Sequence, residues 1–204
     1  LFRSMGDQQL LDSMYYDGLM DVFYNTHMGA TSENIAKMYN ISREEQDEFA
    51  LMSHQRACAA INNKTQADEI VPIEIKTRKG TAVFSIDEHP RQGLTIEDLR
   101  KLKPVFMTEG TITAGNSSGL GDGAAAIVMM SLDKARELGV RPLARIVSTA
   151  NAAVDAKIMG MGVVSSVRRA LHFANLKTED IDYWEINEAF AAQFLGCNRE
   201  LKLD

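Results

Sequence analysis

The spacing of apolar and polar residues predicts helices in the first part of the chain. Apolar positions in residues 7–24 follow no clear period and fit either a helix or a loop. Thr31 or Ser32 is expected to cap a short helix that runs to Tyr39. The sequence Ser42-Arg-Glu-Glu45 is a capping box, and it opens a longer helix to residue 62. The predicted inward residues of this helix are Phe49, Met52 and Ala60.

A hairpin and a second short helix are predicted next. Residues 70–76 alternate in the manner of a strand, with Pro72 marking a sheet edge. A turn at Arg78-Lys-Gly80 returns the chain through residues 82–86. Residues 95–103 fit a short helix that is stopped by a proline. The first 110 residues are therefore expected to form a mixed unit of helices and short strands.

The hydrophobic pattern changes after residue 111. Three short apolar runs are predicted to be strands: residues 124–131, 143–150 and 183–186. Three further runs are predicted to be helices: residues 133–138, 164–174 and 188–200. Strands that alternate with helices indicate a layered α/β architecture.

Two stretches in this part have an unusual composition. Between two apolar runs, residues 111–130 hold five small or flexible residues: Gly115, Ser117, Ser118, Gly119 and Gly121. Such residues form either a tight loop that feeds a core strand or a slot that a ligand can enter. The second stretch, Asn187-Glu-Ala-Phe-Ala-Ala-Gln193, places an amide where an apolar strand ends and a helix begins. The two stretches together raise the case for a binding slot.

Composition narrows the possible functions. The 204 residues are 45% hydrophobic and 25% charged, as in ordinary globular proteins. A formal charge of −6 argues against wholesale binding of nucleic acid. Cys58 and Cys197 lie far apart and in no metal-ligand spacing, which fits a reducing compartment. No apolar run reaches membrane-spanning length, and we expect a cytoplasmic protein that does not bind membranes.

One region departs from this acidic average. Residues 76–103 hold seven Lys and Arg residues against four Asp and Glu residues. This local excess suits a small anionic ligand, or it is simply a solvated face.

Several motifs stand in a specific order along the chain. Asp17-Gly-Leu19 and His27-Met-Gly29 come first, followed by Ser32-Glu-Asn34 and Ser42-Arg-Glu-Glu-Gln-Asp47. Thr113-Ala-Gly-Asn-Ser-Ser-Gly119 and Asp122-Gly-Ala-Ala-Ala126 follow, and the stretch from Asn187 to Gln193 closes the set. Each motif is weak alone. As an ordered set that covers nearly the whole chain, they resemble the thiolases, the acetyl-CoA acetyltransferase family.

The resemblance implies an α/β fold, the thiolase fold, which is a layered α/β/α/β/α arrangement of two similar halves. Residues 1–118 would form an α+β loop domain inserted in the N-terminal half, residues 119–140 the last part of that half, and residues 141–204 the start of the C-terminal half. The sequence opens at Leu1 without Met and stops at Asp204 in what reads as an unfinished element. We therefore expect an incomplete piece of a longer protein, which would form a homodimer or homotetramer.

The resemblance also implies a two-step acyl transfer between thioesters of coenzyme A. A cysteine thiolate takes the acetyl group from one acetyl-CoA. A base removes a proton from the methyl group of a second acetyl-CoA, and the carbanion attacks the acyl-enzyme to give acetoacetyl-CoA. The reverse reaction is thiolysis. The expected partners are thus acetyl-CoA and CoA, with no metal and no cofactor other than these substrates.

Ten residues match positions that have roles in the family. Asn187 matches the amide that holds a water facing the thioester oxygen, so it is the expected catalytic residue, and it is also well suited to cap a helix. Arg91 matches a contact near the adenine and phosphate end of CoA, and Ser118 matches a residue that bonds the pantetheine amide. The remaining matches line the CoA and acyl pocket: Leu19, His27, Met28, Phe106, Ala114, Met159 and Phe190. The His-Met-Gly form at residues 27–29 is typical of the short-chain branch.

The catalytic cysteines and histidine of the family have no match here. Cys58 and Cys197 stand in no family motif, and His89-Pro90 lacks the glycine of the family's Gly-His-Pro sequence. The chain also has Val163 where the family has a proline, which affects the local loop only. The chain alone is therefore expected to be inactive. The alternatives are a non-catalytic CoA-binding or assembly protein derived from the family, and a degradative thiolase for longer acyl chains.

Overall fold

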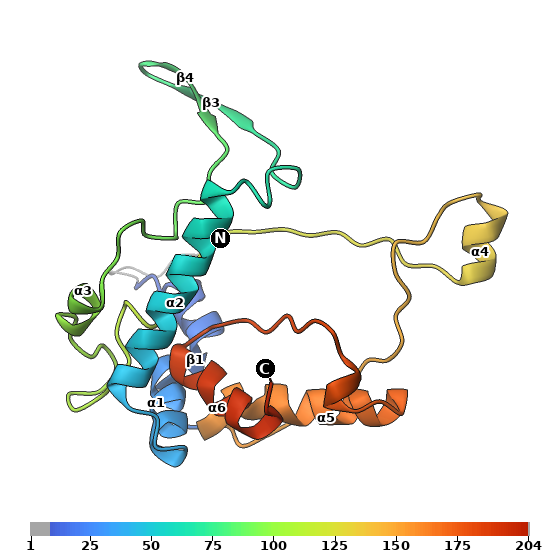
Figure 1. Cartoon of the computed structure of the whole chain (residues 1–204). Coiled ribbons are helices and arrows are strands. Elements are labelled where there is room, and N and C mark those ends of the chain that lie inside the picture. Colours follow the sequence, from blue (N-terminus) through green and yellow to red (C-terminus); the bar gives the residue numbers. More distant parts are fainter. Residues whose placement is uncertain (1–8, 204) are drawn as a thin grey trace, which may run out of the picture.

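The computed structural model describes residues 9–203 (Figure 1). Its helices are η1 (Met14–Leu19), α1 (Met28–Met38), α2 (Arg43–Asn62), α3 (Ile96–Arg100), α4 (Leu132–Glu137), η2 (Ala156–Met161), α5 (Gly162–Ala174), η3 (Thr178–Asp180) and α6 (Ala191–Leu201). Its strands are β1 (Met20–Asp21), β2 (Thr26–His27), β3 (Ile73–Thr77) and β4 (Gly80–Phe84). Within the predicted helix or loop at residues 7–24, the π-helix η1 and the strand β1 form, while residues 7 and 8 lie outside the described part.

The body of the molecule is a group of helices around α1, which contacts η2 and α6 (Figure 1). Neighbouring residues of α1 point to different sides of the helix and belong to two small cores. Ile35 packs with Met161, Val164, Cys197 and Leu201. Ala36 packs with Ile41, Ile112 and Ala192. Helix α1 is therefore buried on two sides, and it fixes α6 relative to the segment around residue 112.

Helix α1 begins earlier than its sequence predicts. The N-cap residue is His27, whose Nδ1 accepts a hydrogen bond from the backbone N–H of Gly29 at 3.0 Å. The prediction of Thr31 or Ser32 as the cap is wrong, because both residues already lie inside the helix and are buried. The Thr31 hydroxyl instead donates to the Met28 carbonyl oxygen at 2.6 Å.

The capping box of α2 is confirmed, but its buried face is not the predicted one. The Ser42 hydroxyl accepts from the backbone N–H of Glu45, and the Glu45 carboxylate accepts from the backbone N–H of Ser42. The predicted inward residues Phe49, Met52 and Ala60 are only half-buried. The fully buried positions near the start of the helix are polar, at Gln46 and Asp47. Both side chains turn inward because they bond to groups of the 111–116 segment.

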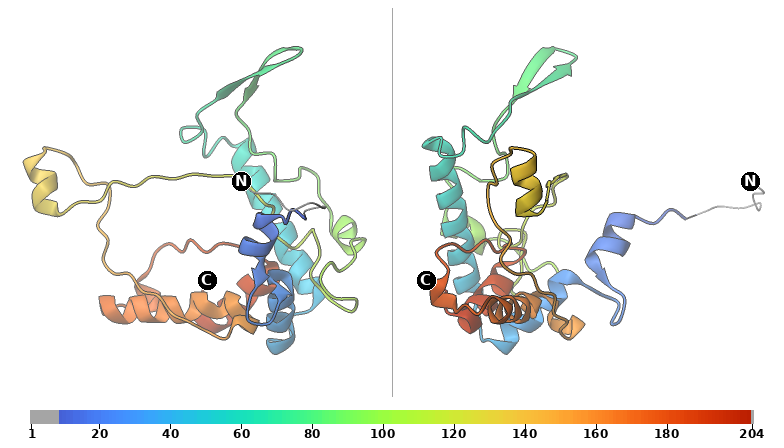
Figure 2. Two further views of the ribbon diagram at one scale, coloured as in Figure 1. Left: turned by 180° about the vertical axis from the view of Figure 1, so that it is seen from behind. Right: turned by 90° about the vertical axis from the view of Figure 1, so that its right-hand side faces the viewer.

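The predicted hairpin is confirmed. Strands β3 and β4 pair antiparallel, with Ile73 opposite Phe84 and Thr77 opposite Gly80. Gly80 has a φ of 122°, a backbone conformation that residues with a side chain rarely adopt. The hairpin stands away from the helical body, and all its residues are exposed (Figures 1 and 2).

The three strands predicted at residues 124–131, 143–150 and 183–186 do not form. In the described part of the chain, the only sheets are the pairs β1–β2 and β3–β4. A strand needs a neighbour for its backbone N–H and C=O groups, and the single segment that leads to α4 runs apart from the body (Figure 1). Its apolar side chains are exposed, with Val128 at 85% and Leu143 beyond α4 at 103%. The layered sheets are thus not assembled by these residues, although the apolar runs that would build them are present.

The helices of this part are confirmed with shifted ends. Helix α5 begins at Gly162, two residues before its predicted start, and helix α6 begins at Ala191 rather than at residue 188. Phe190 is extended because it forms an isolated bridge with Ser117, which delays the start of α6. None of the helices in residues 9–203 is both long enough and apolar enough to cross a membrane.

Candidate functional site

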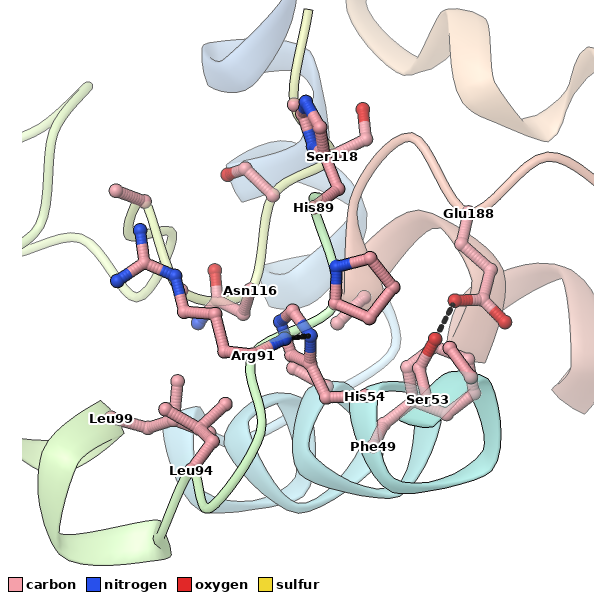
Figure 3. A pocket seen from close by; sticks show the side chains of 18 of the residues that line it. Phe49, Ser53, His54, His89, Arg91, Leu94, Leu99, Asn116, Ser118 and Glu188 are labelled. Atoms are coloured by element: carbon pink, nitrogen blue, oxygen red, sulfur yellow. Dashed lines mark hydrogen bonds between the residues drawn. The ribbon is translucent and has the colours of Figure 1, made fainter. Parts of the chain in front are cut away.

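A cavity of about 1640 Å³ lies beside helix α2 (Figure 3). Its walls come from α2, from α3 with Leu102, from the start of α6, and from three loop segments at residues 88–94, 114–119 and 185–188. Four of the ten predicted site residues line it: Arg91, Ala114, Ser118 and Asn187. The two stretches of unusual composition thus meet at one cavity, although they are about 70 positions apart in the sequence.

The wall at residues 111–118 is held by buried side chains rather than by a sheet. The Asn116 side chain is 3% exposed, and its Oδ1 accepts from the backbone N–H of Thr113 at 2.8 Å. Its Nδ2 donates to Asp47 Oδ1 at 3.0 Å and to the Thr111 carbonyl oxygen at 3.1 Å. Asp47 Oδ2 also forms an ion pair with Arg43 Nε at 2.7 Å. Because every polar atom of Asn116 has a partner, this loop has a single defined course beside the cavity.

The same wall is anchored to helix α1 by Glu33. The Glu33 carboxylate accepts from the backbone N–H groups of Thr111 and Ile112, at 2.8 and 2.9 Å, and from the Thr111 hydroxyl at 2.9 Å. Glu33 is 7% exposed. Gly110 makes room for this carboxylate, because a Cβ atom there would overlap Glu33 Oε1. We call Glu33, Asp47 and Asn116, with the backbone of residues 111–116, the polar clamp.

The wall that carries Asn187 is joined to this one through the backbone. The Ser118 N–H donates to the Ala189 carbonyl oxygen at 3.0 Å, and the Ala191 N–H donates to the Asn116 carbonyl oxygen at 2.9 Å. These bonds hold Ser118 and Asn187 on adjacent segments of one cavity. The interpretation of Asn187 as a helix cap is wrong, since α6 begins at Ala191 with Phe190 as its N-cap. Its amide is exposed and lines the cavity.

Two histidines for which the sequence predicts no role lie beside Arg91. His54 on α2 accepts at Nδ1 from the backbone N–H of Arg91 at 3.3 Å (Figure 3). Burial lowers the pKa of His54, and the nearby charges of Arg91 and His89 lower it further, while Glu188 opposes them. His89 lies against Gly119, where a Cβ atom would overlap its ring. No sequence signal points to these roles, because each histidine stands alone in the chain.

A second group of site residues forms an aromatic row next to the cavity. The His27 ring stacks on the Phe106 ring with centroids 4.6 Å apart, and Phe106 meets Phe190 edge to face at 6.0 Å. At the other end, the centroid of the Tyr15 ring lies 5.6 Å from the centroid of the His27 ring. We call these four residues the aromatic row. Burial lowers the pKa of His27, so its ring is neutral near neutral pH. Gly29 is required beside it, since a Cβ atom there would overlap the Phe106 ring.

Three predicted residues fall in neither group. Leu19 ends η1 and Met28 begins α1, and both are half-buried. Met159 lies in η2 and is 50% exposed. In the described part of the chain, the residues that line the cavity do not include Leu19, Met28 or Met159.

The described residues offer no activated thiol and no metal cluster. Both cysteines are buried, Cys58 at 8% and Cys197 at 0% exposure. Burial raises the pKa of the Cys197 thiol, which disfavours the nucleophilic thiolate. Between residues 9 and 203, no group of three or more His, Cys, Asp and Glu side chains is arranged to hold a metal ion. The site therefore offers amides, hydroxyls, small side chains and one arginine, together with two histidines and several carboxylates, and these groups suit binding and orienting a ligand.

Comparison with known proteins identifies the family. Residues 2–133 match the thiolase N-terminal domain, and residues 140–204 match the thiolase C-terminal domain. An acetyl-CoA acetyltransferase of Pseudomonas aeruginosa is 53% identical over 201 residues, which are 98% of this chain and 51% of that protein. A probable acetyl-CoA acyltransferase of Staphylococcus aureus is 50% identical over 98% of this chain and 51% of its own length. The chain thus spans about half the length of the curated relatives it matches.

Solved structures give the same result for the fold. An acetyl-CoA acetyltransferase from Syntrophomonas wolfei matches with a TM-score of 0.90 at 49% identity, over 97% of this chain and 50% of that one. Human mitochondrial 3-ketoacyl-CoA thiolase matches with a TM-score of 0.91 at 44% identity, over 100% of this chain and 51% of that one. Since nearly the whole chain superposes, its extended segments also follow the course of those folds. The chain belongs to the thiolase family, and its fold is an incomplete piece of the thiolase fold.

Proposed function

We propose that the full-length protein carrying this sequence is an acetyl-CoA C-acetyltransferase. It joins two acetyl-CoA molecules into acetoacetyl-CoA, or cleaves acetoacetyl-CoA with CoA in the reverse direction. The observation that carries the proposal is the meeting of Ser118 and Asn187, on two hydrogen-bonded segments, in one cavity that Arg91 also lines. The likeness to acetyl-CoA acetyltransferases supports the same reaction.

The proposed roles follow from the chemistry of each side chain. Asn187 orients a hydrogen-bond donor toward the thioester oxygen, where negative charge develops, without adding a charge of its own. Ser118 bonds the pantetheine amide, and Ala114 lets the pantetheine arm lie close to the backbone. Arg91 meets the phosphate end of CoA, for which a guanidinium is well suited.

The remaining predicted residues line the narrower end of the substrate. The aromatic row supplies flat apolar surface from His27, Phe106 and Phe190 for the acyl group and the inner pantetheine. Leu19, Met28 and Met159 belong to the same wall in this proposal. CoA thioesters are the substrates, and the reaction needs no metal and no further cofactor.

We propose a division of labour within the whole protein. Residues 1–118 act as the loop domain that binds CoA, residues 119–140 complete the N-terminal half, and residues 141–204 begin the C-terminal half. The nucleophilic cysteine and the base come from other parts of the protein, because both cysteines here are buried. The whole protein works in the cytoplasm as a homodimer or homotetramer.

The test is steady-state thiolysis of acetoacetyl-CoA by the full-length protein. Asn187→Ala should lower kcat by about 100- to 1000-fold, the usual cost of removing one oxyanion-site donor. Arg91→Ala should instead raise the KM for CoA with little change in kcat, because it acts in binding only. A wild-type protein without thiolase turnover would overturn the proposal, as would an Asn187→Ala variant with full turnover.

A non-catalytic CoA-binding or assembly protein is the second candidate, favoured by the burial of both cysteines. The intact mass of the native protein separates the two. A mass well above 22.6 kDa is expected for the enzyme. A native mass of 22.6 kDa would exclude catalysis by this chain and leave CoA binding or assembly as its function.

A further inference from the structure

The residue next to Asn187, Glu188, is hydrogen-bonded through its side chain to helix α2 on another side of the cavity. The Ser53 hydroxyl, in the middle of α2, donates to Glu188 Oε2 at 2.6 Å (Figure 3). The two residues are 135 positions apart in the sequence. The bond therefore ties the helix that forms one side of the cavity to the segment that carries Asn187.

This bond reaches a stretch that has few other anchors. The backbone bonds of Ser118 and Ala191 hold the segment only on the C-terminal side of Asn187. On the N-terminal side, the hydrogen bonds found within residues 9–203 engage none of residues 182–187. Glu188 is thus the first residue after η3 whose side chain fixes the segment to the body of the molecule.

The partner of Glu188 is a neutral hydroxyl. Glu188 is exposed, and the ion pairs among the described residues do not include it, so the Ser53 hydroxyl is the side-chain partner of its carboxylate there. A hydroxyl that donates to a carboxylate makes a short and comparatively strong hydrogen bond, and the 2.6 Å distance fits this class. The peptide unit between residues 187 and 188 is planar, so an anchor on Glu188 limits the positions that the Asn187 backbone can take.

We propose that Glu188 is a positioning residue for Asn187, and that Ser53 is its anchor on α2. This inference rests on the proposed function of Asn187. Neither residue touches the reacting atoms in this scheme. They keep the Asn187 amide directed at the thioester oxygen, and their loss lets the amide move away from it.

The experiment compares variants of the full-length enzyme in thiolysis of acetoacetyl-CoA. Ser53→Ala and Glu188→Ala should each lower kcat by about 10- to 100-fold, since a misplacement of roughly 1 Å can cost that much. The KM for CoA should stay near the wild-type value. Ser53→Thr keeps the hydroxyl and should restore most of the lost kcat. The double variant should be no slower than the worse single variant, because both remove the same contact.

A matched control comes from another carboxylate that accepts a short side-chain bond. Glu137 accepts from Lys134 at 2.6 Å on α4, which stands apart from helix α2 (Figure 1) and does not line the cavity. Glu137→Gln should leave kcat and KM unchanged. Urea unfolding of every variant shows whether a lower kcat comes with a general loss of stability.

The outcomes separate this inference from the proposed function. If Asn187→Ala lowers kcat but Ser53→Ala does not, the positioning role is overturned while the proposed function stands. If Ser53→Thr fails to restore kcat, the hydroxyl is not the anchor and the inference fails. If Asn187→Ala leaves kcat unchanged, the proposed function itself is wrong.

Discussion

His27 has two structural roles, of which the first requires a neutral ring. Its Nδ1 caps helix α1, and its face stacks on Phe106 in the aromatic row. A protonated Nδ1 carries a hydrogen atom and cannot accept the bond from Gly29. The ring is therefore a structural part of the row as well as a candidate contact for the substrate.

Substitution of His27 separates the two roles. His27→Ala should lower the free energy of unfolding by about 1–3 kcal/mol, through the lost cap and the lost stack. His27→Asn should restore the cap only and lose less, because an asparagine side chain caps helices well. Urea unfolding measures both values. Equal losses in the two variants would show that the cap contributes nothing.

The lowered pKa values of His27 and His54 predict how stability changes with pH. Burial is the main cause for both, and His54 also faces Arg91, His89 and Glu188. Both folded-state values lie below the ordinary 6.5, so near neutral pH the rings are uncharged whether the protein is folded or unfolded. As the pH falls below 6.5, the unfolded chain binds protons first, and stability is lost.

This loss is measurable in urea. The unfolding midpoint should be lower at about pH 5.5 than at about pH 7.5, and His54→Gln should reduce the difference, since one of the two histidines is then gone. Substitution of His172, which is exposed on α5, is the control and should leave the difference intact. A midpoint that rises toward acidic pH would contradict the assignment.

At the scale of elements, the polar clamp fixes the backbone of residues 111–116, as pairing with a neighbouring strand would in a sheet. It holds residues 111–116 against α1 and α2 through the side chains of Glu33, Asp47 and Asn116. The cavity wall thus keeps its shape in the absence of strand pairing. Loss of one clamp residue should affect the whole wall.

Glu33→Gln tests the clamp. The variant keeps one acceptor oxygen but turns an NH₂ group toward backbone donors, so it should lower the free energy of unfolding by about 2–4 kcal/mol. Glu97→Gln is the control, because Glu97 forms only an exposed ion pair 3.9 Å long with Arg100. That change should stay within roughly 0.5 kcal/mol. Similar small losses in both variants, measured in urea, would mean that the clamp is not needed.

Elements with local signals were predictable from the sequence. The capping box at Ser42 and the turn at Gly80 give a correct helix and a correct hairpin, because their bonds join residues a few positions apart. The helix predicted over residues 95–103 forms as the shorter α3, with Thr95 as its N-cap. The family motifs contain three of the four predicted residues that line the cavity, Ala114, Ser118 and Asn187, and their roles stay predictions. The contacts that build the site were not predictable. Gln46 and Asp47 were not among the predicted inward residues, and they are buried because Gln46 bonds to Thr111 and Asp47 bonds to Asn116.

At the scale of the whole molecule, the segments between residue 119 and α5 carry many apolar side chains that are exposed to solvent. Side chains such as Ile127, Val128 and Ile146 are 64–85% exposed, and the segments that carry them have no paired neighbour in the described residues. The strands predicted here do not form among residues 9–203, because strand pairing depends on other segments of a complete sheet. We propose that the rest of the full-length protein supplies those neighbours.

Hydrogen exchange tests this view of the open segments. In a polypeptide limited to residues 1–204, backbone amides of residues 124–130 should exchange much faster than those in the middle of α2, because they lack hydrogen-bonded partners. In the full-length protein the same amides should become protected. Equal protection of residues 124–130 in both would mean that these residues pair within this chain alone.

The close fit of Glu33 and Gly110 has a consequence for how this protein family diverges. The carboxylate fills the space that a side chain at position 110 would need, so the two positions are not free to change one at a time. A lineage that replaces Gly110 first must displace the carboxylate and lose the clamp. We expect an alignment of distant relatives to show the two positions changing together, with glycine retained at 110 wherever glutamate is retained at 33.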